Sequence, residues 1–122
     1  MKRDMSLVRD ILLEIELSDV APNSDNMEIE GHNAAERDYH IQLMHEADLI
    51  EGVDGTTLAG YSLMRIRLTW SGHDFLDAIR DDSIWFGVGK RLKDTGGSAT
   101  FEVVKALAVE LGKEALGLSG PK

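Results

Sequence analysis

The sequence predicts an α+β fold in which helices alternate with short strands. Apolar residues recur at helical spacing near the start of the chain, in a stripe formed by Met5, Val8, Ile11, Leu12 and Ile15. Residues 63–68 instead alternate apolar side chains with arginines, as a half-buried strand does. A chain of 122 residues with 43% hydrophobic residues has the size and composition of one globular domain.

Three segments are expected in the first quarter of the chain. The first helix runs over residues 4–17, and the polar stretch 18–26 is a loop. Residues 27–30 alternate apolar and acidic side chains and are followed by Gly31. This pattern predicts a short edge strand that pairs beside the later strands.

A second helix and a strand pair are expected next. Asn33 and Glu36 have the spacing of a capping box, which predicts a helix over residues 33–48. Two strands follow at 49–53 and 63–68, separated by an exposed loop. Strict alternation in the second strand predicts one buried side and one solvent side, formed respectively by Met64, Ile66 and Leu68 and by Arg65 and Arg67.

The last part of the chain predicts three helices. Thr69 and Ser98 are the expected N-caps of helices over residues 70–80 and 99–116. A helix between them ends at a glycine pair and carries Ile84, Trp85, Val88 and Leu92.

This order of elements is that of a winged helix. Residues 43–50 resemble the end of a recognition helix, L-x-x-A-G-L-I, and residues 68–76 resemble the L-T-x-x-G-x-x-x-L pattern that leaves a second wing strand. Asp48 replaces the glycine of the first pattern, so we expect a left-handed backbone there. We therefore predict a single domain, with residues 1–82 winged-helix-like and residues 83–117 a C-terminal helical extension.

The chain also resembles one particular family over nearly its whole length. The block Gly72-His73-Asp74-Phe75-Leu76-Asp77-Ala78-Ile79-Arg80-Asp81-Asp82 carries the resemblance, together with Met1-Lys2-Arg3-Asp4-Met5, Tyr39-His40-Ile41, Trp85 and Phe101-Glu102-Val103-Val104-Lys105. It is similar to the bacterial and prophage family catalogued as domain of unknown function, number twenty-five thirteen. The resemblance implies no established activity and suggests a regulatory or mobile-element accessory protein.

Several chemistries are excluded or unsupported. The chain has no cysteine, which excludes disulfides, thiolate zinc sites and cysteine nucleophiles. His73 with Asp77, and Glu36 with His40, lie one helical turn apart, but a zinc site needs three or four protein ligands. We expect no enzyme, no catalytic residues, no metal and no cofactor. We also expect a cytoplasmic protein without a signal peptide or membrane span.

Charge opposes the usual function of a winged helix. Residues 1–82 contain seven Lys and Arg against eighteen Asp and Glu, a balance of −11, and residues 83–122 contain six against four, a balance of +2. Phosphate binding normally requires a basic face. If the chain binds DNA, we expect weak binding through the wing and the recognition helix, at Arg65, Arg67, Arg37, Gln42 and His45.

The last predicted helix has an unusually wide apolar arc. We expect it to bury more than one side, against its own core or in a homodimer, through Phe101, Val104, Ala108, Val109 and Leu111. Two functions remain open at this point. The first is a non-catalytic regulatory protein with weak DNA binding. The alternative is a protein–protein interaction module that does not bind nucleic acid.

Overall fold

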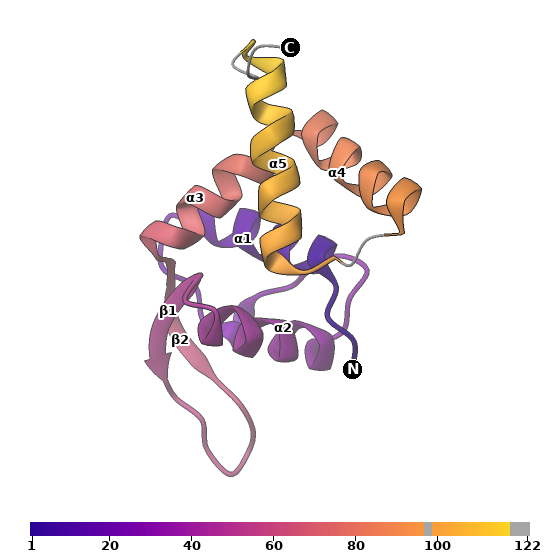
Figure 1. Cartoon of the computed structure of the whole chain (residues 1–122). Coiled ribbons are helices and arrows are strands. Elements are labelled where there is room, and N and C mark those ends of the chain that lie inside the picture. Colours follow the sequence, from indigo (N-terminus) through magenta and orange to yellow (C-terminus); the bar gives the residue numbers. More distant parts are fainter. Residues whose placement is uncertain (97–98, 118–122) are drawn as a thin grey trace. The chain divides into compact units, whose positions relative to one another are not determined.

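The described residues form an α+β structure of helices and one antiparallel hairpin. The computed structural model describes residues 1–96 and 99–117 (Figure 1). Its elements, in chain order, are α1 (Met5–Leu17), η1 (Ser24–Asn26), α2 (Ala34–Glu46), β1 (Ile50–Asp54), β2 (Leu63–Leu68), α3 (Trp70–Ile79), α4 (Asp82–Thr95) and α5 (Phe101–Ala115). The predicted fold class, with two early helices, a hairpin and further helices, is confirmed.

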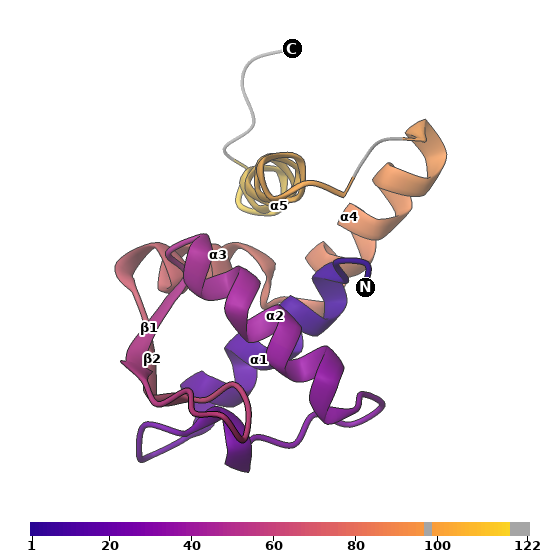
Figure 2. The ribbon, with the colours of Figure 1, turned by 90° about the horizontal axis from the view of Figure 1, so that it is seen from below.

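The chain divides into two compact units, Met1–Asp74 and Phe75–Lys122. In the first unit α1 packs against α2 and β2, and Figure 2 shows α1 and α2 crossing beside each other. The predicted apolar stripe of α1 faces this core, which buries Leu7, Ile11, Leu12, Ile41, Met44 and Ile66. The helical spacing read from the sequence therefore identifies the buried face of α1.

Both helices of the first unit begin at side-chain caps. Asp4 caps α1 by accepting hydrogen bonds from the backbone N–H groups of Ser6 and Leu7. At α2 the Asn33 side chain accepts from the Glu36 N–H at 2.8 Å, and the Glu36 carboxylate accepts from the Asn33 N–H at 3.1 Å. The predicted capping box is confirmed, and it fixes where α2 starts.

A buried imidazole joins the two helices. His40 is 1% exposed, and its Nε2 accepts a hydrogen bond from the Asp4 N–H at 2.8 Å. Its Nδ1 donates to the Glu36 carbonyl oxygen at 2.8 Å. These two bonds define the tautomer that carries its proton on Nδ1. The contact between His40 and Glu36, one helical turn apart, is therefore made to the backbone oxygen of Glu36.

The hairpin contains a bulge that changes which side chains are buried. β1 and β2 pair with Ile50 opposite Leu68 and Val53 opposite Met64, and the register shifts between Glu51 and Val53. Arg65 has φ +53°, a left-handed conformation that is uncommon for a residue with a side chain. Before the bulge, buried and exposed side chains alternate in the opposite order to the predicted one, so Leu63 is buried and Met64 is exposed. The prediction that Met64 lies on the buried side was wrong.

The predicted strand at residues 27–30 is not formed, since the described sheet has two strands. The chain just before it takes the place beside β2. Pro22 O accepts from the Ile66 N–H at 2.8 Å, the Asn23 side chain from the Arg65 N–H at 2.9 Å, and the Ser24 hydroxyl from the Leu63 N–H at 3.0 Å. Two of these acceptors are side chains, so the edge of β2 is satisfied without a regular strand.

The residues of the two winged-helix patterns meet at the start of α3. Asp48 has φ +62°, the left-handed conformation predicted for it. The Thr69 hydroxyl donates to the Asp48 carbonyl, and its oxygen accepts from the Gly72 N–H at 3.0 Å. A Cβ on Gly72 would lie 2.0 Å from the Leu49 carbonyl oxygen. Glycine is therefore required in this pattern by close backbone approach.

In the second unit α4 packs beside α5. Asp81 caps α4, and Gly96, with φ +67°, ends it as predicted. The N-cap of α5 is Thr100, which accepts from the Val103 N–H at 3.3 Å, and the helix begins at Phe101 rather than Ala99. Ser98, the expected cap, and Gly97 lie outside the described residues. Whether the chain is one domain, as predicted from its length, stays a prediction.

Candidate nucleic-acid interface

Arg37 is largely buried in the first unit and is engaged by two groups of the chain. Its Nε donates to the Asp38 carboxylate and one terminal nitrogen donates to the Met27 carbonyl, both at 2.9 Å. The side chain is 13% exposed. Arg37 thus connects α2 to the segment after η1. Because residues 27–30 form no strand, the carbonyls of this segment have no partners in a sheet.

Gln42 and His45 do lie on the exposed side of α2. Their surroundings are acidic, since the exposed Glu46 ends the same helix and the exposed Asp48 follows two residues later. A carboxylate-rich helix end repels phosphates and lowers the local attraction for nucleic acid. The predicted recognition helix therefore exposes two polar side chains, Gln42 and His45, but the negative charge around them is unfavourable for binding phosphates.

The two hairpin arginines are both exposed, but they are not equivalent. Arg67 forms an ion pair across the strands with Glu51, and both side chains are largely exposed. Arg65 lies at the bulge and has a left-handed backbone, while the buried Ile66 separates it from the exposed Arg67. The hairpin thus exposes Arg65 together with Arg67, whose charge is balanced by the Glu51 carboxylate.

An exposed apolar patch on the hairpin was not predicted. We call it the hairpin patch; it consists of Val53, Met64 and Leu58. Val53 is 52% exposed and lies opposite Met64 in the register, while Leu58 in the connecting loop is fully exposed. The register shift at the bulge creates the patch, because it brings Met64 to the outside. In the sequence, the available signal was a pair of isolated apolar residues, Val53 before the glycine-containing loop and Leu58 within it.

The hairpin loop is held by its own polar groups. The Asp54 carboxylate accepts from the Thr56 N–H at 2.9 Å, and hydrogen bonds from the Thr56 side chain and backbone hold the pKa of Asp54 below its usual value. The Tyr61 hydroxyl is buried and has no hydrogen-bond partner among the described residues. Burial raises the pKa of Tyr61, and the negative charges of Asp38 and Asp54 add to the effect.

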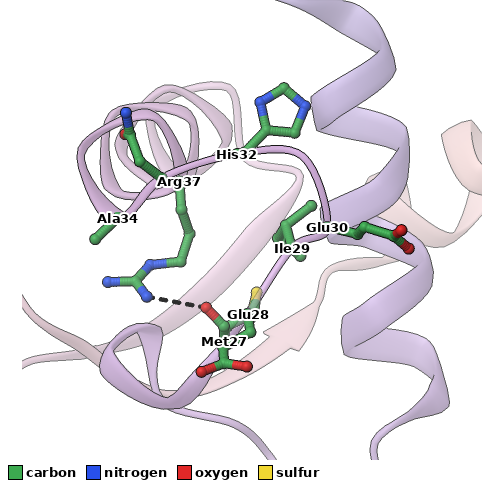
Figure 3. A pocket seen from close by; sticks show the side chains of 8 residues that line it. Met27, Glu28, Ile29, Glu30, His32, Ala34 and Arg37 are labelled. Carbon is green, nitrogen blue, oxygen red and sulfur yellow. Dashed lines mark hydrogen bonds between the residues drawn. The ribbon is translucent and has the colours of Figure 1, made fainter.

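A pocket of about 530 Å³ lies between the segment after η1 and the start of α2 (Figure 3). Arg37 reaches across it to the Met27 carbonyl, whereas the Glu30 carboxylate points away from that guanidinium (Figure 3). His32 contacts the Glu36 carboxylate at 3.4 Å. Arg37 and His32, the basic side chains of the pocket, are thus already engaged in contacts that hold the fold.

No group of three or more metal-ligating side chains is found among residues 1–96 and 99–117. His73 is exposed in the first turn of α3, and Asp77 accepts a hydrogen bond from Arg80 at 2.7 Å. In the same ranges, no helix combines the length and apolar character needed to cross a bilayer.

Most of the predicted interface residues of α5 face the inside of the second unit. Val104 and Ala108 are buried, and the Phe101 ring lies 4.6 Å from that of Phe75, centroid to centroid. Leu111 packs so closely on α4 that a Cβ on Gly87 would lie 3.0 Å from its Cδ1. Of the five predicted residues only Val109, at 40%, is exposed.

The fold and surface together define a small α+β protein with an acidic first unit, an exposed hairpin and a pair of packed C-terminal helices. The chain belongs to the family described as hypothetical protein (DUF2513), whose model matches residues 2–98. It is similar to a protein of Haemophilus influenzae named "Uncharacterized protein", with 34% identity over 109 residues that cover 88% of this chain and 92% of the relative. No solved structure matches the chain.

Proposed function

We propose that this chain is a non-catalytic protein-interaction module of winged-helix type that binds a protein partner through its hairpin. The observation that carries the proposal is the hairpin patch, an apolar surface beside the Arg67–Glu51 ion pair. Exposed apolar side chains grouped on one element are typical of protein-binding surfaces. A regulatory or mobile-element accessory role is part of the proposal.

Charge indicates what kind of partner fits. The balance of −11 over residues 1–82 favours a partner whose contact surface is apolar at its centre and basic at its rim. Glu51 lies two residues before Val53 on the same face of the strand and would face such a rim. The proposal includes no catalysis, because the pocket near α2 uses Arg37 and His32 in structural contacts.

The test places a photo-crosslinking side chain at Val53 in the full chain, with the same group at Val20 as the control. Val20 is 81% exposed and lies between α1 and η1, outside the hairpin. We expect one partner to crosslink from position 53 only, and to bind the purified wild-type chain. Val53→Asp with Met64→Asp should weaken that binding about tenfold or more. Equal crosslinking from both positions, or unchanged binding by the double variant, would contradict the proposal.

Weak DNA binding is the second candidate, and the exposed Arg65 is the observation that favours it. We expect affinity without marked sequence preference and with a steep dependence on salt. Gel-shift titration at low salt tests this, with Arg65→Ala plus Arg67→Ala as the test variant. Lys90→Ala plus Lys93→Ala removes the same charge from α4 and serves as the control. Loss of the shift only in the hairpin variant supports DNA binding, and no shift by the wild type excludes it.

A further inference from the structure

The outward face of α5 carries a pattern of charges that is complementary to itself. Opposite the buried Val104 and Ala108, a shallow groove of about 440 Å³ is lined by Glu102, Lys105, Ala106, Val109, Glu110 and Lys113. Two glutamates and two lysines surround two small apolar residues at the centre. This groove face is distinct from the residues that pack α5 into its own unit.

We propose that α5 pairs with α5 of a second copy of this chain, antiparallel and about a two-fold axis between Leu107 and Ala108. Such an axis places Glu102 opposite Lys113 of the other copy, and Ala106 opposite Val109. Glu102 and Lys113, the charged residues of the seam between the two helices, therefore each meet the opposite charge of the other copy. Lys105 and Glu110 lie on opposite edges of this seam and do not face each other across it.

The spacing of the face fits helix pairing. Glu102, Ala106, Val109, Lys113 and Leu116 are separated alternately by four and three residues, which is the spacing of a coiled-coil seam. The small side chains of Ala106 and Val109 at the centre allow the two backbones to approach closely. Leu116, 75% exposed, extends the apolar part of the seam beyond Lys113.

The charges on the groove face indicate which partner binds to it and whether the partner helix runs parallel or antiparallel to α5. A parallel pair in register would place Glu102 against Glu102 and Lys113 against Lys113, which is unfavourable. The face has no net charge, so a strongly acidic or basic partner gains nothing from it. Glu114, by contrast, lies outside this groove and forms an ion pair with Arg91 of α4 at 3.8 Å. A second copy in the antiparallel direction is the partner that pairs Glu102 with Lys113 at both ends of the seam.

Charge reversal tests the pairing in the full chain by sedimentation equilibrium. The wild type should approach twice the 13.5 kDa chain mass as concentration rises. Glu102→Lys alone, or Lys113→Glu alone, should weaken association about tenfold or more, because each creates two like-charge contacts per dimer. The two single variants mixed together, and the double variant, should associate like the wild type. Lys93→Glu, on α4, is the control for the change in charge and should not weaken association.

Direction is tested separately, and the chain is suited to it because it has no cysteine. Ala106→Cys and Val109→Cys chains, mixed and oxidised, should form the mixed disulfide in preference to either symmetric one. Circular dichroism should show unchanged helix content for all these variants, since every substituted side chain is exposed or lies at the surface. A wild type that stays monomeric at high concentration, single reversals that associate normally, or preferred symmetric disulfides would each overturn the proposal.

Discussion

Ser24 and His40 are the polar side chains buried in the described core, and both are held by hydrogen bonds to distant backbone groups. Ser24 meets β2, and His40 meets the start of α1. A buried donor left without its acceptor costs more than the bond itself contributes. These two residues therefore fix how the loop and the helices of the first unit join.

Ser24→Ala should destabilise the protein by about 1–3 kcal/mol, because it leaves the Leu63 N–H without an acceptor. Urea unfolding of the full chain measures the effect. Ser71→Ala, at an exposed position in the first turn of α3, is the matched control and should change stability by no more than about 0.5 kcal/mol. Equal effects at the two positions would show that the loop does not depend on the Ser24 bond.

At the level of secondary-structure elements, the β-bulge determines which side chains of the hairpin are exposed. Arg65→Gly should raise stability by up to about 1 kcal/mol, because glycine adopts φ near +53° without the strain of a side chain. Arg67→Gly, in ordinary strand backbone on the same hairpin, should lower stability by about 0.5–1 kcal/mol. Thermal unfolding of both variants checks the contrast. A loss of stability in both would mean that the bulge is not strained.

The capping box of α2 should make stability depend on acid pH. Hydrogen bonding to the Asn33 N–H, followed by the contact with His32, holds the pKa of Glu36 below its unperturbed value of 4.5. Its stabilising effect is therefore fully present above pH 4.5 and is lost as pH falls through the lower pKa of the folded state.

Glu36→Gln should consequently lose stability relative to the wild type at neutral pH, and the difference should shrink as pH falls below 4.5. Urea unfolding at a series of pH values measures it. Glu46→Gln, at the other end of the same helix, is the control. A difference between wild type and Glu36→Gln that stays constant over this range would exclude a role for the ionised carboxylate.

For the whole molecule, the dominant physical feature is a net charge of −9. Repulsion among like charges destabilises a compact state, and salt screens it. The Debye length falls from about 30 Å at 0.01 M salt to about 8 Å at 0.15 M. We therefore expect the thermal midpoint to rise over this range. Glu14→Gln with Glu28→Gln, two exposed positions of the first unit, should reduce the rise; a midpoint that falls with salt would contradict the expectation.

Local sequence signals predicted most of the elements correctly. The capping box at Asn33 and Glu36, the left-handed Asp48 and the terminating Gly96 all depend on side chains within a few residues of one another. The strand at residues 27–30 was wrong for the opposite reason. Its alternation fits an edge strand, but residues 22–24 occupy the place beside β2. Their side-chain and backbone acceptors bind N–H groups of β2, which is about forty residues away in the sequence.

The sequence by itself determined the fold class, the order of its helices and hairpin, the family and the acidic balance of the chain, because these follow from spacing and composition. Only the tertiary structure decided which side chains remain at the surface. It engaged Arg37 with Met27 and Asp38, turned Met64 outward at the bulge, and packed Val104 and Ala108 inward. The physical reason is that exposure depends on neighbours brought together by folding, and no local pattern specifies them.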